Sequence, residues 1–182
     1  MSKVPFTSLL INGERRPAST GATFEVRSPH TGVLASTAAA ASKDDCRAAI
    51  EAAQRAFPAW EETPSSTRRQ ILLRALATLQ SEEWKKKAAA SIRAEVAMPE
   101  SHLTFNLHSG PSLLTDFACL VNELKGETLP SVIPGGQVFV QRRALGVVCV
   151  CSLTARHYFS VASAVLTVTA DTQWYHGMVL FR

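Results

Sequence analysis

The first forty residues alternate between short apolar runs and turn-forming residues. Residues 9–11 are apolar, Asn12-Gly13 is a typical two-residue hairpin turn, and residues 23–26 return to β-forming side chains. Thr31-Gly32 turns the chain again before residues 33–37, which can form a further strand. The pattern predicts a β-meander with little room for a core of its own, so we expect it to lie against another part of the chain.

A helical period begins at Ser42. This serine is a good N-cap, and two aspartates follow it in the first turn, where they favour the helix dipole. Apolar side chains then recur at spacings of three and four residues, which predicts one buried stripe. The stripe consists of Ala49, Ile50, Ala53, Ala56 and Phe57. We expect the helix to end at Pro58, because proline has no N–H for the helical ladder.

Two more helices are predicted after this proline. Thr63 with Pro64 has the form of an N-cap followed by proline at the first helical position. The predicted buried face of the second helix is Ile71, Leu72, Ala75, Leu76 and Leu79. Ser81, followed by two glutamates, starts the third helix, which we expect to run to about Ala97, before Pro99.

Residues 113–124 indicate a fourth helix, with Pro111 near its start and Gly126 just past its end. Residues 126–136, "GETLPSVIPGG", have the composition of a loop. Residues 137–151 then form two strand-like pieces, the second almost wholly apolar. Such a run is typical of a strand buried on both faces of a parallel sheet, so the whole pattern predicts the α/β class.

The composition fits one globular domain without a large charged patch. The chain has 182 residues, 46% hydrophobic and 19% charged, with a formal net charge of +4. The tightest basic run, residues 85–87, follows two glutamates and indicates a solvated helix face. No basic stripe favours nucleic acid, and no apolar run suits a membrane helix or a secretory signal. Four cysteines do not suggest a disulfide framework, so we expect a cytoplasmic protein. Together with the scattered charge and the short apolar runs, this predicts neither nucleic-acid nor membrane partners.

The cysteines do not form a recognisable site. Cys149 and Cys151 are two residues apart and would point to one side of a strand, but with only His157 nearby nothing completes a set of four metal ligands. Cys46 lies early in the first helix and Cys119 on an apolar helix face. A nucleophilic role would need a depressed thiol pKa, and no partner for it is visible. Core or surface thiols remain the simpler interpretation.

Histidines and glutamates give no stronger signal. His30 precedes a turn and should be exposed, while His102 and His108 lie in an irregular polar stretch. None has the i, i+4 spacing with glutamate that marks a zinc helix. Glu51 and Glu95 are best interpreted as solvated helix residues. The segment "IPGGQ" lacks the spaced glycines, preceding strand and following helix of a dinucleotide-binding motif.

Several segments together carry a resemblance to a known family. They are "LLINGERRPASTGATFEVRSPHTGVLAS", "AAIEAAQRAFPAWEETPSSTRRQILLRALATL", "GETLPS", "PGG" and "RRALGVVCVC", in that order. In order and spacing, residues 1–151 resemble the N-terminal part of the aldehyde dehydrogenase family, although Ala144 stands where the family usually has proline. The general character is similar to fungal or bacterial members that act on aromatic aldehydes.

The resemblance implies a Rossmann-like NAD(P) domain, a separate domain carrying the catalytic thiol, and a β-arm used for oligomerisation. Family chemistry begins when a cysteine thiolate attacks the aldehyde, while a backbone N–H and an asparagine amide stabilise the oxyanion. Hydride passes to the nicotinamide, and a glutamate-activated water then hydrolyses the thioester. The implied fold is the N-terminal hairpins and helices of this family with the start of a Rossmann-like parallel sheet, which is incomplete.

The resemblance stops at the oxyanion turn. Where the family places Pro-Trp-Asn, this sequence has Leu153, Thr154 and Ala155, and alanine has no side-chain hydrogen-bond donor. The family's cofactor-contacting lysine and glycines, its glutamate and its nucleophilic cysteine have no counterparts in residues 152–182. We therefore assign no catalytic, cofactor-binding or metal-binding residue, and we expect no cofactor to bind this chain.

Residues 152–182 look like a foreign tail on a family beginning. A truncated product or misread exon boundary explains the abrupt change better than a divergent tail, although both remain open. We predict a truncated, inactive member of an NAD(P)-dependent family. The alternatives are an interaction module that pairs with itself or with a full-length paralogue, and a short active enzyme that uses Cys149 or Cys151. We also expect Leu145, Val147, Val148 and Val150 to lack packing partners.

Overall fold

The computed structural model describes residues 4–149. Five strands come first: β1 (Phe6–Thr7), β2 (Leu9–Ile11), β3 (Glu14–Arg16), β4 (Thr23–Arg27) and β5 (Leu34–Ala39). Four helices and a 3₁₀ turn follow: α1 (Lys43–Glu61), α2 (Ser65–Gln80), α3 (Glu82–Val96), α4 (Glu100–Leu120) and η1 (Val121–Glu123). The last two strands are β6 (Glu127–Pro130) and β7 (Gln137–Val140). This mixture confirms the predicted α/β class.

The predicted meander is present. β2 and β3 pair antiparallel, and the turn between them places Asn12 at φ 54° and Gly13 at φ 78°. Positive φ at both central positions matches the right-handed twist of the strands, which is why Asn-Gly suits this turn. In the second sheet β5 lies between β1 and β4, pairing parallel with β1 and antiparallel with β4.

The meander packs on α1, as its small size predicted. Side chains from β2, β5, the segment after β3 and α1 form one buried cluster, which consists of Leu9, Ile11, Ala18, Ala39 and Ala52. Among the apolar residues of α1 only Ala52 is fully buried and Ala49 packs beside it, whereas Ile50, Ala53 and Ala56 are exposed. The predicted apolar stripe is therefore wrong for these three residues, since α1 meets the meander along a narrower line.

Proline does not end α1. Ser42 caps the helix as predicted, but the helix continues through Pro58 to Glu61. Proline removes one N–H from the ladder, yet its own carbonyl still accepts from the amide of Glu62 at 3.3 Å. Thr63 is not the cap of α2, because its hydroxyl donates back to the Ala59 carbonyl at 2.9 Å. The predicted end of α1 at Pro58 and the predicted Thr63 cap of α2 are therefore both wrong, because hydrogen bonds stabilise α1 beyond the proline.

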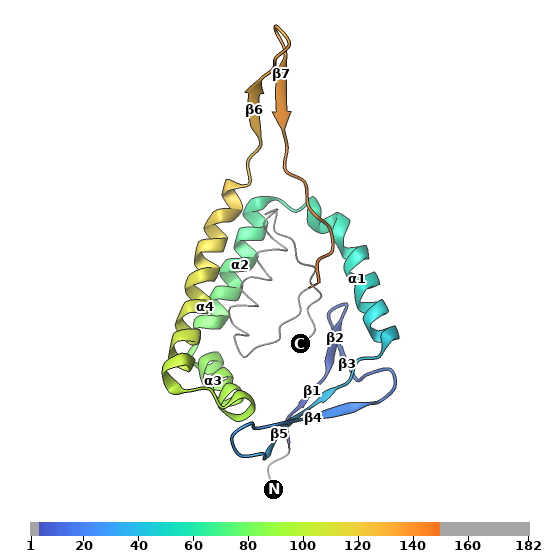
Figure 1. The fold of residues 1–182 in the computed structure, drawn as a ribbon, viewed down its shortest axis with the longest axis vertical. Coiled ribbons are helices and arrows are strands. Elements are labelled where there is room, and N and C mark those ends of the chain that lie inside the picture. The colour runs from blue at the N-terminus through green and yellow to red at the C-terminus, as the bar shows by residue number, and fades with distance from the viewer. Residues whose placement is uncertain (1–3, 150–182) are drawn as a thin grey trace.

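Helices α2 and α4 run side by side in Figure 1, and η1 packs against α2. Their shared core consists of Leu72, Leu114, Ala118 and Val121. Leu76 and Leu79 pack around it as predicted, while Ala75 is exposed. α3 starts at the Ser81 cap and ends at Val96, as expected, with Ala97 in the left-handed region at φ 51°.

Helix α4 begins at Glu100, thirteen residues before the predicted start at residue 113. His102 and His108 therefore lie on a helix and not in an irregular stretch, so that prediction is wrong. The buried face of α4 consists of Leu103, Asn106, Gly110, Pro111, Leu114 and Ala118. The Asn106 amide donates to the His102 carbonyl at 2.7 Å, which satisfies this polar group inside the helix pair.

The last described segment is a hairpin that projects from the body (Figure 1). β6 pairs antiparallel with β7, with Thr128 opposite Phe139 and Leu129 opposite Val138. The loop prediction is therefore wrong for Glu127–Pro130. Residues 141–149 form no strand, and no strand within residues 4–149 lies beside them. The expected strand is therefore missing from residues 145–149, because a parallel strand forms only when it can hydrogen-bond to neighbouring strands. Val150 and Cys151 lie outside the described residues.

Leu145 and Val147 have 66% and 41% of their surfaces exposed, so neither is buried in a sheet core as in a complete parallel sheet. Val148 is intermediate in burial. In the same part of the chain, residues 4–149, no helix combines the length and apolar character needed to cross a bilayer.

Candidate functional site

The candidate thiols are scattered over the described residues. Cys46 is half-buried in the first turn of α1 and Cys149 is half-buried after β7. Cys119 is exposed on α4, so its predicted place on an apolar face is wrong. Cys151 and His157 lie outside the described residues. Within residues 4–149 no three His, Cys, Asp or Glu side chains are arranged to hold a metal ion.

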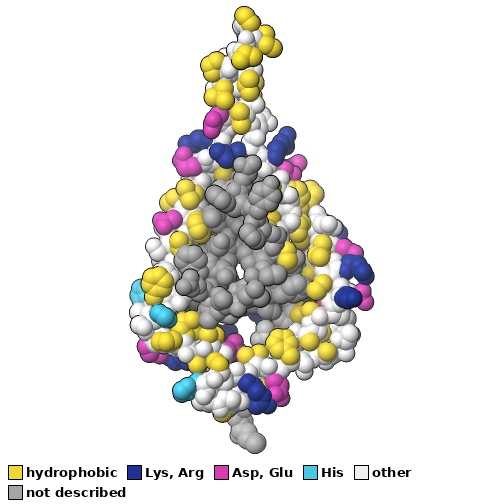
Figure 2. Space-filling model, in the orientation of Figure 1, with side chains coloured by type: hydrophobic (Ala, Val, Ile, Leu, Met, Phe, Trp, Pro, Cys, Tyr) yellow, Lys and Arg dark blue, Asp and Glu magenta, His cyan; other side chains and the backbone are white. Residues whose placement is uncertain are grey.

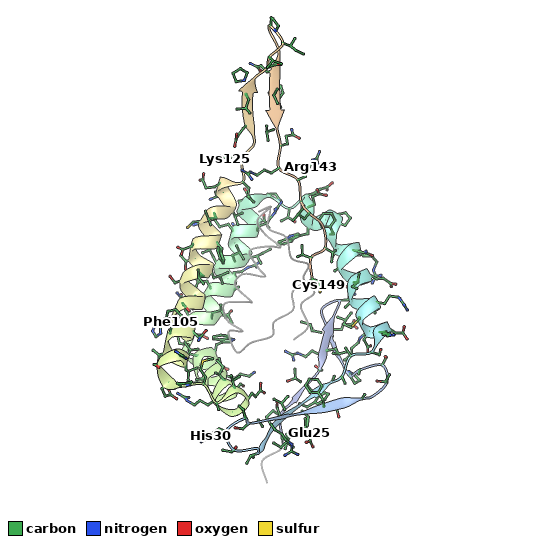
Figure 3. The ribbon with its side chains drawn as sticks, viewed as in Figure 1. Glu25, His30, Phe105, Lys125, Arg143 and Cys149 are labelled. Atoms are coloured by element: carbon green, nitrogen blue, oxygen red, sulfur yellow. The ribbon has the colours of Figure 1, made fainter. Side chains whose placement is uncertain are left out.

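The three histidines within residues 4–149 are all exposed. His30 is exposed at the turn after β4, as predicted, and Figure 3 shows it far from Phe105 and Cys149. His102 and His108 are exposed on α4, where Nδ1 of His108 lies 2.8 Å from the Thr104 carbonyl oxygen. These positions bring no histidine beside a thiol in the way that nucleophilic catalysis requires.

The two glutamates considered in the sequence, Glu51 and Glu95, differ in burial. Glu51 is exposed on α1, as predicted. Glu95 is half-buried and accepts a 2.7 Å hydrogen bond from the hydroxyl of Ser36, itself buried on β5. The prediction of a solvated Glu95 is therefore wrong, because this side chain ties α3 to the sheet.

Asp45 is the best-satisfied polar group described, and it links the meander to α1. Its side chain is 2% exposed. One carboxylate oxygen accepts from the amides of Ser42 (2.9 Å) and Ser19 (3.0 Å) and from both serine hydroxyls. The other oxygen lies 3.6 Å from the Arg16 guanidinium. These amide donors, Ser42 first and then Ser19, lower the pKa of Asp45 from 3.8 to about 2, against the opposing effect of burial.

Arg68 closes the junction between α1 and α2. Its guanidinium donates to the carbonyls of Thr63 (2.8 Å) and Glu61 (3.0 Å) and lies 6.0 Å from the centre of the Trp60 ring. Free carbonyls at the end of α1 thereby find donors, which explains how the helix can end beyond its proline.

An open hollow of about 430 Å³ lies where the hairpin joins the helices. It is lined by Glu61, Ser65, Arg68, Val121, Leu124, Gly126, Gln141, Arg142, Arg143 and Ala144. Arg68 donates to backbone carbonyls here, and Arg142 donates to the Lys125 carbonyl at 3.2 Å. Since these arginines already serve the backbone, we interpret the hollow as a junction between elements and not as a substrate pocket.

The hairpin carries the most concentrated apolar surface. Figure 2 shows apolar side chains along its whole length, and Figure 3 places Lys125 and Arg143 at its base. We define the hairpin surface as Leu129, Val132, Ile133, Val138, Phe139 and Val140, all of them exposed. The sequence interpretation missed it because Pro130, Pro134 and two glycines suggested a loop. The available signal was the β-forming run Val138–Val140, preceded by Leu129 across a turn that contains two glycines.

Known proteins match most of this chain. The sequence model of the aldehyde dehydrogenase family matches residues 16–152. A vanillin dehydrogenase from Pseudomonas fluorescens is 39% identical over 140 residues, which cover 77% of this chain and 28% of that protein. The chain thus spans little more than a quarter of the length of this relative.

Two solved structures share the fold. A salicylaldehyde dehydrogenase from Pseudomonas putida G7, solved with salicylaldehyde, has a TM-score of 0.78 at 24% identity over 91% of this chain and 34% of its own. A betaine aldehyde dehydrogenase from Staphylococcus aureus, solved with NAD⁺, has a TM-score of 0.77 at 20% identity. The match covers 90% of this chain and 34% of that protein. Together with the match over residues 16–152, they show that this chain belongs to the aldehyde dehydrogenase family.

Proposed function

We propose that this chain is the N-terminal part of an NAD(P)-dependent aldehyde dehydrogenase, and that by itself it does not oxidise aldehydes. Family membership and the similar vanillin dehydrogenase support aldehyde oxidation as the reaction of the intact protein. The NAD⁺ in the related betaine aldehyde dehydrogenase supports NAD(P) as its cofactor. A cytoplasmic location and a non-family tail over residues 152–182 belong to the same proposal.

The main support for inactivity is the sequence Leu153-Thr154-Ala155, which stands in place of the family's Pro-Trp-Asn turn. The family resemblance places an oxyanion-binding asparagine at the last of these positions, and alanine cannot donate a hydrogen bond. Loss of one such donor costs about 10²–10³ in kcat.

The described residues also do not fit a dinucleotide. Gly135 and Gly136 form the tip of the β6–β7 hairpin, where the Gly136 amide donates to the Ile133 carbonyl at 2.9 Å. A pyrophosphate site needs glycines between a strand and a helix N-terminus, so that several amides face the phosphates. Here the next element is β7, and the glycine amide is already engaged.

The test is turnover by the purified 182-residue chain with an aromatic aldehyde and NAD⁺ or NADP⁺. We expect no NAD(P)H above background, with an intact vanillin dehydrogenase as the positive control. Turnover that disappears in Cys149→Ser or Cys151→Ser would refute the proposal. Millimolar NAD⁺ should also leave the Tm unchanged, whereas ligand at a hundred times its Kd would stabilise a binding protein by about 2.7 kcal/mol.

A second function is an interaction module that pairs with a second copy or with a full-length subunit. The hairpin surface favours it, because Phe139 is 70% exposed and stands among further exposed aliphatic side chains. We expect the chain to co-purify with a full-length family subunit and Val138→Lys to abolish this. Loss of the complex in Ile50→Lys on α1, but not in Val138→Lys, would refute a hairpin interface.

A further inference from the structure

We infer that Met98 is a site of reversible oxidation to methionine sulfoxide, and that this oxidation breaks a contact between the α3–α4 junction and the buried face of α4. Met98 lies between Ala97, the left-handed residue that ends α3, and Pro99, the N-cap of α4. Its sulfur accepts a hydrogen bond from the side-chain amide of Asn106, with 3.6 Å between nitrogen and sulfur. The inference depends neither on aldehyde oxidation nor on contacts of the hairpin.

The Asn106 amide is buried and uses this sulfur as an acceptor. The residue is 8% exposed, so water cannot readily replace a lost partner. Its nitrogen carries two hydrogens and donates both to the His102 carbonyl, at 2.7 Å, and to the Met98 sulfur. If the sulfur no longer accepts, one buried N–H is left without a partner, which is unfavourable inside a protein.

The thioether is open to small oxidants. Met98 is half-buried whereas its amide partner is buried, so a peroxide should reach the sulfur from the side away from Asn106. With hydrogen peroxide, a sulfur lone pair attacks one oxygen, the O–O bond breaks and an S–O bond forms. The proton of the transferred oxygen moves to the departing oxygen, which leaves as water. Sulfur thereby loses two electrons and the peroxide gains them.

The sulfoxide does not fit the present contact. Oxidation makes the new oxygen, and not the sulfur, the main acceptor of the side chain. An oxygen on the solvent side points away from Asn106. An oxygen on the Asn106 side would lie well inside hydrogen-bonding distance of the amide nitrogen, which is only 3.6 Å from the sulfur. In both cases the amide loses its acceptor or residues 97–99 move relative to α4, so oxidation loosens the junction and reduction of the sulfoxide restores it.

The test compares the full chain with Met98→Leu before and after treatment with dilute hydrogen peroxide. The methionines of the sequence are Met1, Met98 and Met178, so the variant keeps the other two oxidisable and serves as the matched control. We expect peptide mapping to find the sulfoxide at Met98 and the Tm of the parent to fall by about 2–4 °C, the shift that corresponds to one lost hydrogen bond in a chain of this length. The two methionine sulfoxide reductases, one for each epimer, should restore the Tm. The Tm of Met98→Leu should not change on oxidation.

NMR of the Asn106 side-chain amide provides the second measurement and does not depend on the folding of the variant. Its N–H signals should shift when Met98 is oxidised and return after enzymatic reduction. If Met98 stays reduced while Met1 and Met178 are converted, the proposed oxidation site is wrong. Equal losses of Tm in the parent and in Met98→Leu, or Asn106 signals that do not move when Met98 is oxidised, would overturn the coupling to α4.

Discussion

The α2–α4 helix pair and the β6–β7 hairpin are neighbours in the chain, but they are stabilised in different ways. The helix pair buries Leu72, Leu114 and Ala118 between its own elements. The hairpin satisfies its backbone through the β6–β7 ladder and leaves its large apolar side chains exposed. Apolar residues of similar character therefore stabilise the folded chain in one region, and in the other they are available for contacts with another molecule.

The largest expected effect removes a core side chain from the helix pair. Leu72 is 1% exposed, and Leu72→Ala should lower the free energy of unfolding by about 2–5 kcal/mol, because a buried leucine loses its transfer energy and leaves a cavity. Leu129→Ala on the hairpin is the matched control and should leave the unfolding of the body nearly unchanged. Denaturant unfolding followed by circular dichroism measures both. Equal losses would show that the hairpin belongs to the same packed unit.

A smaller effect tests the polar link between the meander and α1. Asp45→Asn keeps the size of the side chain but removes its negative charge and replaces one acceptor oxygen with an NH₂ group, which faces either the serine donors or the Arg16 guanidinium. We expect a Tm several degrees lower, whereas Asp44→Asn, on the exposed neighbouring residue, should change it little. Equal Tm values for the two variants would contradict the proposed role of Asp45.

The same carboxylate predicts a pH dependence. Since folding lowers the pKa of Asp45 from 3.8 to about 2, its stabilising contribution is complete above pH 3.8 and is lost as the pH falls toward 2. The difference in Tm between the parent chain and Asp45→Asn should therefore narrow over this interval. A difference that stays constant would assign the stabilisation to packing and not to charge.

The smallest effect is at the α3–α4 junction. Ala97 ends α3 at φ 51° and ψ 41°, a left-handed conformation that costs a residue with a Cβ about 1–2 kcal/mol. Glycine avoids this cost but gains entropy in the unfolded chain, so Ala97→Gly should stabilise by less than about 1 kcal/mol. Ala90→Gly, on an exposed position inside α3, should destabilise by about 1 kcal/mol. Destabilisation by both changes would argue against the left-handed cap.

Sequence predicted the features that depend on nearby residues. The Asn12-Gly13 turn and the Ser42 and Ser81 caps are found where expected, because the hydrogen bonds that stabilise them lie within four residues. The packing of the meander on α1 was also predictable, since so few strand residues cannot bury themselves. Family membership followed from the order of several weak motifs over residues 1–151.

Features that depend on distant contacts were mispredicted. The end of α1 is fixed by Arg68, seven residues beyond the Glu61 carbonyl that it caps. The start of α4 was hidden because its buried face includes Asn106, Gly110 and Pro111, which ordinarily indicate loops. The prolines of residues 126–136 concealed the hairpin in the same way. In each case a tertiary contact or a strand pairing outweighs the local preference of the residue.

The Asp45 carboxylate also has a consequence for the order of folding. It completes the cap at the start of α1 through Ser42 and binds Ser19, a residue 26 positions earlier in the chain. The capping box of Ser42 and Asp45 is local, but the Asp45 carboxylate obtains its full set of donors only when the preceding β-ribbon has docked. The stability of the helix start is thereby coupled to the closure of a long loop. We expect the amides of Ser19 and Ser42 to open together in hydrogen exchange, as one cooperative unit that joins the ribbon to the helix.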